Sequence, residues 1–468
     1  MKTPQLRTCF LSAFLLSIIL FAVSCTKVDT TTVVTIPLVA TPSILVNVTS
    51  TTAQSGGIIT SAGGGTILTN GVCYSSTNST PTTADSKTSD AVSTAGTATT
   101  TFTSNLTGLT ANTVYYVRAY ATNSAGIGYG SVKKFTTSAN LSAVVATVTT
   151  FVGNATAGFA NGTGQSALFN NPEGVTADAQ GNIFVCDSYN SVIREITTVG
   201  VVTTFAGNGT NGYADGPAAT AEFYAPKSAA FDTQGNLYVA DFGNNVIRKI
   251  TPAGVVSTFA GNGTAGYLDG PNTLHAQFNG PAGIAIDAQN NIYIAEINNN
   301  LIRKITAAGV VSTIAGIPTA PSAGYVDNTG ALAAFNSPNS LAVDASGNIY
   351  VADQGNSAIR KVTPAGVTTT LAGNPTQPTL VNLPAGLTID KAGNLYIADE
   401  SGRIMEFTTT NTLNLLAGSI NVAGFVDGAG TAAQFSKPQG ITVDASGNIY
   451  VADQNNNCIR KIVISLVP

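Results

Sequence analysis

The chain has few charged residues, one histidine and no tryptophan, and each shortage excludes a class of function. Only 9% of its 468 residues are Asp, Glu, Lys or Arg, and the net charge is −4. No basic run is longer than Arg-Lys, whereas nucleic-acid binding needs clustered Lys and Arg to neutralise phosphates, so nucleic acid is excluded as a partner. A single histidine, His275, argues against a histidine-liganded metal site.

Cysteine is also scarce, at five residues, and its spacing fits neither a zinc site nor a disulfide framework. Cys73, Cys186 and Cys458 occupy apolar positions of expected strands, where a cysteine acts as a small buried hydrophobe. A bridge between Cys186 and Cys458 stays open, because spacing alone cannot show whether its geometry is met.

The N-terminus carries an export leader. Lys2 and Arg7 precede an apolar run over 9–23, a length that suits a signal peptide better than a membrane span. The following Ala22-Val23-Ser24-Cys25 resembles a bacterial lipobox, which implies lipid attachment at Cys25, and Thr26 implies an outer-membrane address. We therefore expect a signal peptide over 1–24, a lipid link to the membrane and a tether over 25–37. The alternative is an ordinary signal peptide with an incidental cysteine.

Residues 38–138 show short alternating apolar segments without a repeat, which predicts a β-sandwich. The stretch 109–126 resembles the fibronectin type III pattern, with Tyr115 placed like the tyrosine-corner residue. Ala111 in place of Pro and Tyr74 in place of the core Trp depart from that family. We interpret this domain as a spacer, joined by a linker over 139–143 to the next domain.

The remaining two-thirds of the chain contain a block that occurs six times. The copies are GNIFVCD (181–187), GNLYVAD (235–241), NNIYIAE (290–296), GNIYVAD (347–353), GNLYIAD (393–399) and GNIYVAD (447–453). Their closing acids are Asp187, Asp241, Glu296, Asp353, Asp399 and Asp453, spaced by 54, 55, 57, 46 and 54 residues. A period near 50 in short β segments indicates a propeller or a solenoid.

Each copy lies in a unit of four expected strands, the number in one propeller blade. Residues 201–250 give one unit: VVTTFAG, a long loop, SAAFD, GNLYVAD and NVIRKI. This order resembles the NHL repeat family over 144–468. The first VxTxAG strand has no blade of its own and the last blade lacks an outer strand. We therefore predict an all-β chain with a six-bladed NHL-type propeller, closed by its N-terminal strand and preceded by the sandwich.

The residues that recur in nearly every unit are expected to be framework. The closing acids are followed by Arg194, Arg248, Arg303, Arg360 and Arg460, and a carboxylate against an arginine satisfies both charges. We take these acids as structural. The long loops also contain phenylalanines three residues before a proline, and we expect their side chains to pack between neighbouring blades: Phe169, Phe223, Phe278, Phe335 and Phe435.

The long loops are expected on one face, which is the candidate ligand-binding face. Repeated aromatic and acidic residues in these loops suit sugar stacking or a peptide, or pack the loops down: Tyr213, Asp215, Tyr267, Asp269, Tyr325, Asp327, Phe425 and Asp427. The fifth unit departs from the repeat, with a short loop, Val381 in place of Phe, and Arg403 after Ser401-Gly402. Such departures are where a specific site or decay of the repeat is found.

No nucleophile–base pair or catalytic residue emerges from the sequence. Propellers similar to this one include amidating lyases, streptogramin-type lyases and gluconolactonase-like hydrolases. We therefore expect a membrane-anchored, extracytoplasmic binding or scaffold protein for a protein or glycan ligand, without a cofactor. The alternative is a lactonase- or lyase-like enzyme with calcium in the central channel, since calcium needs only oxygen ligands.

Overall fold

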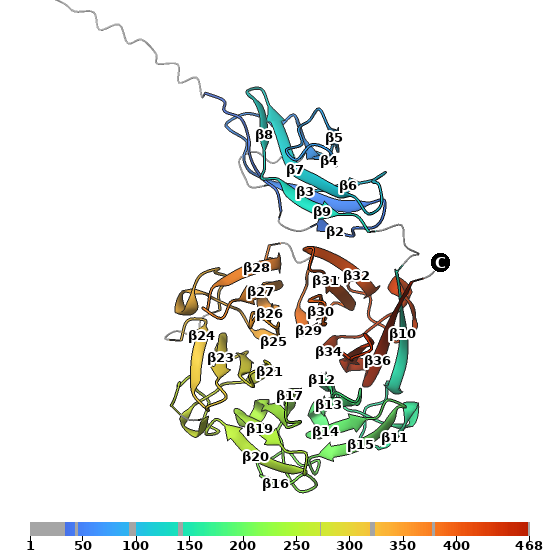
Figure 1. The fold of residues 1–468 in the computed structure, drawn as a ribbon, viewed down its shortest axis with the longest axis vertical. Coiled ribbons are helices and arrows are strands. Elements are labelled where there is room, and N and C mark those ends of the chain that lie inside the picture. The colour runs from blue at the N-terminus through green and yellow to red at the C-terminus, as the bar shows by residue number, and fades with distance from the viewer. Residues whose placement is uncertain are drawn as a thin grey trace, which may run out of the picture.

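The computed structural model describes residues 33–42, 45–92, 100–138, 144–271, 273–318, 323–376 and 380–466. The predicted signal peptide, Cys25 and the linker over 139–143 lie outside these residues. The described chain is all-β, as predicted, and forms a small N-terminal part above a larger ring of sheets (Figure 1). None of its described helices is long and apolar enough to cross a membrane.

The N-terminal part consists of two antiparallel sheets with one core between them. One sheet contains β1 (Leu38–Ala40), β2 (Leu45–Val46), β3 (Ala53–Ser61) and β6 (Thr100–Leu106). The other contains β4 (Thr69–Ser75), β5 (Ser86–Lys87), β7 (Val114–Asn123), β8 (Gly126–Tyr129) and β9 (Lys133–Thr136). Alternate residues of β7, including Val117 and Ala119, point into the core with Leu106 and Phe135.

Two polar contacts fix the two ends of β7, where the chain turns. The Tyr115 hydroxyl accepts a hydrogen bond from the Thr110 N–H at 3.0 Å, which is the contact that a tyrosine corner makes. Asn123 caps the following turn by accepting from the Ala125 N–H at 2.8 Å.

The ring is made of six four-stranded antiparallel units, numbered 1 to 6 along the chain. Unit 1 consists of β12 (Pro172–Ala177), β13 (Ile183–Asp187), β14 (Val192–Ile196) and β15 (Val201–Ala206). Unit 2 consists of β17 (Pro226–Phe231), β18 (Leu237–Asp241), β19 (Val246–Ile250) and β20 (Val255–Ala260). Unit 3 consists of β21 (Pro281–Ile286), β22 (Ile292–Glu296), β23 (Leu301–Ile305) and β24 (Val311–Ala315). Unit 4 consists of β25 (Pro338–Val343), β26 (Ile349–Asp353), β27 (Ala358–Val362) and β28 (Thr368–Gly373).

Units 5 and 6 are joined to strands from elsewhere in the chain. Unit 5 is β29 (Pro384–Ile389), β30 (Leu395–Asp399), β31 (Arg403–Phe407) and β32 (Thr412–Gly418). Unit 6 is β34 (Pro438–Val443), β35 (Ile449–Asp453), β36 (Cys458–Leu466) and the early strand β10 (Val144–Gly153). β10 lies antiparallel to β36, with Val148 opposite Ile462, so the beginning of the ring sequence completes the sheet at its end.

Each unit buries its apolar surface against the next unit. One cluster, for example, combines Tyr238 and Ile247 of unit 2 with Ile284 and Ile292 of unit 3. The loop phenylalanines are fully buried in these clusters, and Val381 takes the same place in unit 5. A single four-stranded unit therefore has no complete core, and the arrangement around a common centre is that of a β-propeller (Figure 1).

The fifth unit carries the N-terminal part. In the other units, a segment of the preceding long loop bridges the outer strand: β11 (Gly162–Thr163) on β15, β16 (Gly216–Pro217) on β20, Gly270 on Val311, Thr329 on Val367, and β33 (Gly428–Ala429) on β10. The loop before unit 5 is too short to supply such a segment. β2 occupies the outer edge of β32 instead, parallel to it, with Val46 opposite Leu413.

This contact joins the N-terminal part, which the sequence predicts to be a spacer, to the ring. The Asn47 N–H donates to the Leu413 carbonyl at 3.2 Å, and Val46 packs against the core of unit 5. The sandwich sheet and unit 5 are thus one continuous sheet, and the exposed strand edge that the short loop leaves is covered.

We predict that Val46→Asp separates the two parts while each stays folded, because it places a charge against the apolar core of unit 5. Small-angle scattering of the full chain should show a larger maximum dimension and a more flexible profile. Leu68→Asp, at an exposed leucine of the sandwich, is the matched control and should change neither. An unchanged profile for Val46→Asp would show that β2 does not hold the two parts together.

Candidate functional site

The structure separates residues that recur in every unit from residues that differ between units. The recurring acids each form an ion pair with an arginine: Asp187–Arg194, Asp241–Arg248, Glu296–Arg303, Asp353–Arg360, Asp399–Arg403 and Asp453–Arg460. The acid side chains are completely buried. A buried charge pair of this kind needs every remaining polar atom to be bonded.

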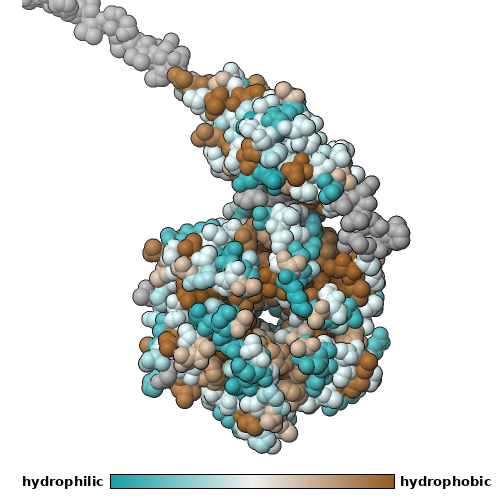
Figure 2. All heavy atoms as spheres, viewed as in Figure 1, coloured by the Kyte–Doolittle hydropathy of each residue, from teal (hydrophilic) through white to brown (hydrophobic). Residues whose placement is uncertain are grey.

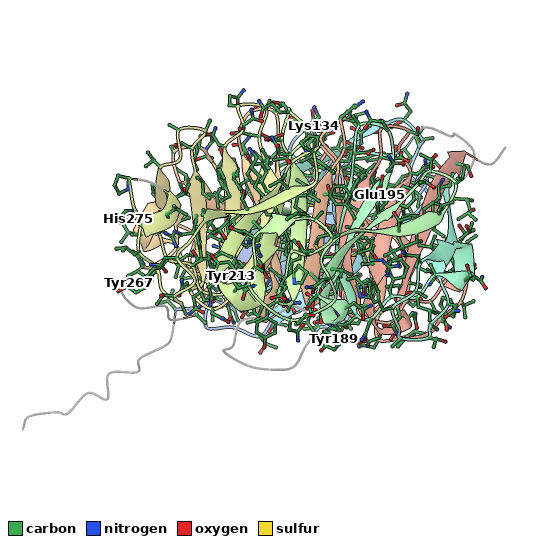
Figure 3. All side chains as sticks on the ribbon, turned by 90° about the horizontal axis from the view of Figure 1, so that it is seen from below. Lys134, Tyr189, Glu195, Tyr213, Tyr267 and His275 are labelled. Carbon is green, nitrogen blue, oxygen red and sulfur yellow. The ribbon has the colours of Figure 1, made fainter. Side chains whose placement is uncertain are left out.

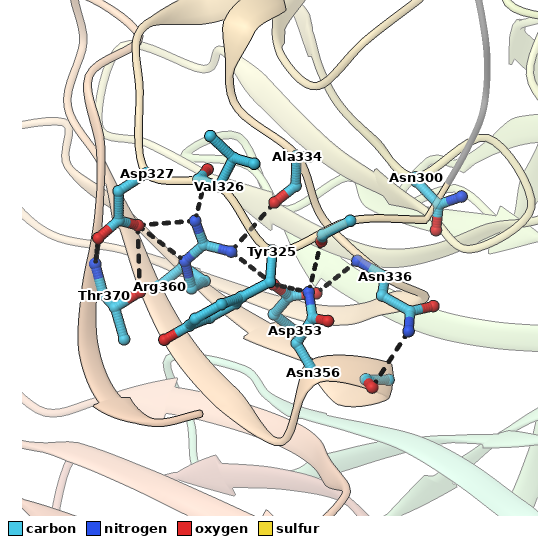
Figure 4. Close-up of polar contacts among 12 residues, drawn as sticks. Asn300, Tyr325, Val326, Asp327, Ala334, Asn336, Asp353, Asn356, Arg360 and Thr370 are labelled. Carbon is cyan, nitrogen blue, oxygen red and sulfur yellow. Dashed lines mark hydrogen bonds and ion pairs between the residues drawn. The ribbon is translucent and has the colours of Figure 1, made fainter. Parts of the chain in front are cut away.

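Unit 4 shows how the pair is satisfied (Figure 4). Arg360 Nη1 donates to Asp353 Oδ2 at 2.7 Å, and Nη2 donates to Asp327 Oδ1 at 2.7 Å. Its guanidinium also binds the carbonyls of Val326 and Ala334 in the preceding loop. Asp353 accepts from the Asn336 N–H and from Asn356 Nδ2. One arginine therefore ties two strands and the long loop together.

Burial dominates the titration of these acids. It raises the pKa of Asp187, Asp353 and Asp453 to about 6 and that of Glu296 to about 7, against the opposite effect of the arginine and amide contacts. Burial likewise raises the pKa of Asp241. In five of the six pairs neither the acid nor the arginine reaches solvent, and Arg403 is only 7% exposed, so the pairs hold the fold.

The loop residues predicted for ligand binding lie on the perimeter of the ring. Asp215, Asp269, Asp327 and Asp427 each bind the buried arginine of their own unit at 2.7 Å, with the acid side chain about half exposed. The aromatic rings of Tyr213, Tyr325 and Phe425 lie over those guanidinium groups. Figure 3 shows Tyr267 at the outer edge. The structure thus distributes these residues one set per unit and does not bring them into one site.

Arg403 also belongs to the framework rather than to a separate site. Met405 occupies the strand position that holds arginine in the other units, and Arg403 lies two residues earlier. Its Nη2 still donates to Asp399 Oδ2 at 2.5 Å, and Ser401 Oγ binds the same carboxylate. The departure of unit 5 from the repeat therefore preserves the ion pair.

The centre of the ring is an open channel lined by the six innermost strands (Figure 2). The channel cavity has a volume of about 190 Å³, and its walls are small and aliphatic residues such as Ala229, Ala285, Ser340 and Ile441. None of the lining residues carries a carboxylate, and no group of three His, Cys, Asp or Glu gathers anywhere in the described part of the chain. The side-chain oxygen atoms along this cavity are hydroxyl groups of serine and threonine residues.

Residues that differ between units meet at one mouth of this channel. The inner ring consists of the residues that follow the first proline of each innermost strand: Glu173, Lys227, Ala282, Asn339, Ala385 and Gln439. These residues line a small cavity of about 30 Å³ together with the adjacent backbone. Because the sheet register places each such proline opposite the closing acid of the next strand, the mouth lies on the long-loop face.

A second set of variable residues surrounds the first. The outer ring consists of the residues that directly follow the six closing acids: Ser188, Phe242, Ile297, Gln354, Glu400 and Gln454. Ser188 is positioned next to the following unit, because its Oγ donates to the Pro226 carbonyl of unit 2 at 2.6 Å. Gln354 likewise contacts Glu400 of unit 5, and Glu400 contacts Gln439 of unit 6.

This surface has an aromatic side and a polar side. On units 1 and 2, Lys227 binds Glu173 at 2.7 Å and lies 5.1 Å from the Phe242 ring centre. Next to them, Tyr189 and Tyr224 expose 68% and 47% of their surface. On units 4 to 6, Glu400 accepts hydrogen bonds from the amides of Gln354 and Gln439. Few surfaces of the ring combine exposed rings with converging polar groups, which is the composition of a ligand site.

Sequence reasoning missed this mouth, although a signal for it was present. When the six units are aligned, the positions after the strand-starting proline and after the closing acid vary, while their neighbours repeat. Attention to the repeated residues led to the perimeter instead. That the two variable positions face the same opening follows only from the strand register and the arrangement of the units around the channel.

The remaining candidate residues lie elsewhere. His275 is in the three-residue helix η4 (Thr273–His275) at the perimeter (Figure 3). Cys186 and Cys458 are free and buried, in separate strands of units 1 and 6, and Cys73 is free and buried in the sandwich. Burial raises the pKa of Cys186 and Cys458, which keeps both thiols protonated and unreactive.

The two acids bound to Arg360 allow a matched test of the framework. Asp353→Asn should lower the free energy of unfolding by about 3–5 kcal/mol, because it leaves a buried cation without its buried partner. Asp327→Asn, at a half-exposed acid on the same arginine, should cost ~1 kcal/mol. Chemical denaturation of both variants checks this, and equal losses would contradict the distinction.

Comparison with known proteins supports the repeat and the fold. The NHL repeat model matches residues 169–194, 335–362 and 435–462. The chain is 28% identical over 319 residues to the protein SUPPRESSOR OF QUENCHING 1, chloroplastic, of Arabidopsis thaliana, covering 65% of this chain and 26% of that protein. It is 30% identical over 230 residues to Teneurin-4 of Homo sapiens, and this match covers 42% of this chain and 8% of Teneurin-4. The chain thus spans only a small part of these relatives.

Solved structures resemble both parts of the chain. A Bacteroides thetaiotaomicron protein of unknown function aligns with a TM-score of 0.54 at 19% identity, covering 92% of this chain and 98% of its own. Two proteins described as auxiliary nutrient binding proteins align with TM-scores of 0.51, one from Bacteroides thetaiotaomicron at 12% identity and one from Bacteroides ovatus at 14%. The two alignments cover 91% and 92% of this chain, respectively, and 98% of each solved chain. The chain is therefore a protein with NHL repeats and a β-propeller fold.

Proposed function

We propose that this protein is a membrane-anchored, extracytoplasmic binding or scaffold protein whose channel mouth recognises a protein or glycan ligand. The observation that carries the proposal is the convergence of the variable residues of six units on one opening. Framework residues recur because every unit needs them, whereas residues that differ from unit to unit and meet at one place serve a single asymmetric partner.

The architecture that we infer is a six-bladed ring, with units 1 to 6 as blades and β10 closing it against β36. Support comes from the pairing of β10 with β36 over their length. We infer that the N-terminal part is fibronectin type III-like, supported by the Tyr115 contact with Thr110. Docked through β2 on unit 5, this domain would leave the mouth free for a ligand.

The structural relatives favour binding over catalysis. Proteins described as auxiliary nutrient binding proteins share the fold over both parts of the chain. The residues that line the channel cavity carry no titratable side chain, and the titratable groups Glu173 and Lys227 lie at the mouth. We therefore assign the mouth a role in recognition.

Replacing one tyrosine by alanine at the mouth and another at the perimeter tests which of the two surfaces binds the ligand. Tyr189→Ala should weaken ligand binding about tenfold, since a large exposed ring at an interface is a frequent source of affinity. Tyr267→Ala, at a half-exposed tyrosine of the perimeter, should bind as the unchanged protein does. The measurement is binding of the full chain in detergent to glycan and peptide arrays, with and without chelator.

The reverse result, loss of binding in Tyr267→Ala alone, would move the site to the perimeter. Loss of binding in chelator would instead require a metal at the site. Equal thermal unfolding midpoints of the two variants are needed for the comparison, and the exposure of both side chains favours this.

We propose that the chain is exported and attached to the outer membrane through lipid on Cys25. We predict that Cys25→Ser abolishes incorporation of an alkyne-labelled fatty acid in cells and releases the protein from the membrane fraction. The physical reason is that only the thiol can form the thioether, and that anchoring grows with the number of buried CH₂ groups. Cys9→Ser is the control and should remain labelled. Labelled Cys25→Ser protein would contradict the anchor.

A further inference from the structure

The polar side of the mouth is organised around one carboxylate. Glu400 follows Asp399 at the end of β30 and lies between Gln354 of unit 4 and Gln439 of unit 6. Gln354 Nε2 donates to Glu400 Oε1 at 2.6 Å, and Gln439 Nε2 donates to the same oxygen. Gln439 is 7% exposed, so its amide is held in place by the surrounding chain. Three units thus build one cluster from residues that do not recur in the repeat.

The cluster has a defined hydrogen-bonding capacity. An ionised carboxylate only accepts hydrogen bonds, so both amides must turn their NH₂ groups toward Glu400. Each amide carbonyl oxygen then points away from Glu400. Within the described residues, no donor contacts Glu400 Oε2 or the side-chain oxygens of Gln354 and Gln439. The cluster therefore retains three acceptor oxygens, together with the second N–H of each amide.

Its charge is not balanced by a cation. No lysine or arginine forms an ion pair with Glu400 among the described residues, and Lys227 across the mouth is bound to Glu173. An anionic ligand would therefore be repelled by the Glu400 carboxylate, and this electrostatic repulsion is stronger where the protein lowers the local dielectric constant. A hydroxyl group, which both donates and accepts, matches the acceptor oxygens and the amide N–H groups.

The opposite side of the mouth complements such a ligand. The backbone N–H of Tyr189, in unit 1, binds the Asn170 carbonyl, and the Tyr224 ring packs over Gly243 of unit 2. The Ser188 Oγ, next to Tyr189, donates to the carbonyl of Pro226, two residues after Tyr224, and so brings these segments of units 1 and 2 together. Both rings are exposed, so they can cover an apolar face of a ligand while their hydroxyl groups stay in water.

Building on the proposed function, we propose that the ligand is a neutral, polyhydroxylated glycan. Its hydroxyl groups bind the cluster of Glu400, Gln354 and Gln439, and its sugar rings stack on Tyr189 and Tyr224. The selectivity is against anionic sugars, since Glu400 repels a carboxylate, sulfate or phosphate group.

The test uses two probe sets that differ only in charge. Neutral oligosaccharides and the same oligosaccharides with a terminal uronate are titrated into the full chain in detergent. The neutral set should bind at least about tenfold more tightly than the uronate set. Glu400→Gln should weaken neutral binding about tenfold and reduce the discrimination between the sets, because it removes the charge and replaces one of the two carboxylate acceptor oxygens with an NH₂ donor.

Glu195→Gln is the matched control, at a glutamate of β14, the third strand of unit 1, opposite Thr203 of the outer strand, and should match the unchanged protein. If Glu400→Gln lowers the unfolding midpoint, Gln354→Leu, which keeps the side chain's size, takes its place and should weaken neutral binding. Tighter binding of the uronate set, or neutral binding that these variants leave unchanged, would overturn the inference.

The outcomes also separate this inference from the proposed function. Binding of basic peptides alone, lost in Tyr189→Ala, would retain a recognition site at the mouth and reject a glycan as its ligand. If no glycan or peptide binds, both the ligand class and the binding function are wrong.

Discussion

The buried ion pair between a strand-ending acid and an arginine of the next strand is the contact on which the ring depends. Its guanidinium also binds the carbonyls and the aspartate of the long loop, as Arg360 does with Val326, Ala334 and Asp327. One charged group thus connects the inner strands, the outer edge and the loop of a unit. A buried charge is costly unless every partner is present, so the contact defines one arrangement of the loop.

This constraint explains why the perimeter residues recur and the mouth residues do not. The perimeter acids and aromatic rings complete the coordination of arginine, and a change there would leave a buried cation under-satisfied. The residues at the channel mouth directly follow the framework positions in the sequence, but they are not needed to satisfy a buried arginine. They are free to differ between units, and a mixed set of side chains then surrounds one opening. A symmetric scaffold in this way presents an asymmetric surface.

Unit 5 shows how a departure from the repeat is compensated. Its short loop supplies no segment for the outer edge of β32, and β2 of the N-terminal part pairs with that edge instead. Arg403 moves along its strand and still reaches Asp399. The same unit supplies Glu400, the centre of the polar side of the mouth. Loss of the regular loop thus accompanies the attachment of the sandwich, and the same unit places Glu400 at the opening.

The sequence by itself determined the all-β class, the repeating four-stranded units and the framework residues, because these depend on local alternation and on spacing that repeats along the chain. Tyr115 in the sandwich was recognisable for the same reason. Only the tertiary structure decided where Glu400, Gln354 and Gln439 lie relative to one another, and that β2 covers β32. These contacts join residues 39 or more positions apart in the chain through register and curvature, which no local pattern encodes.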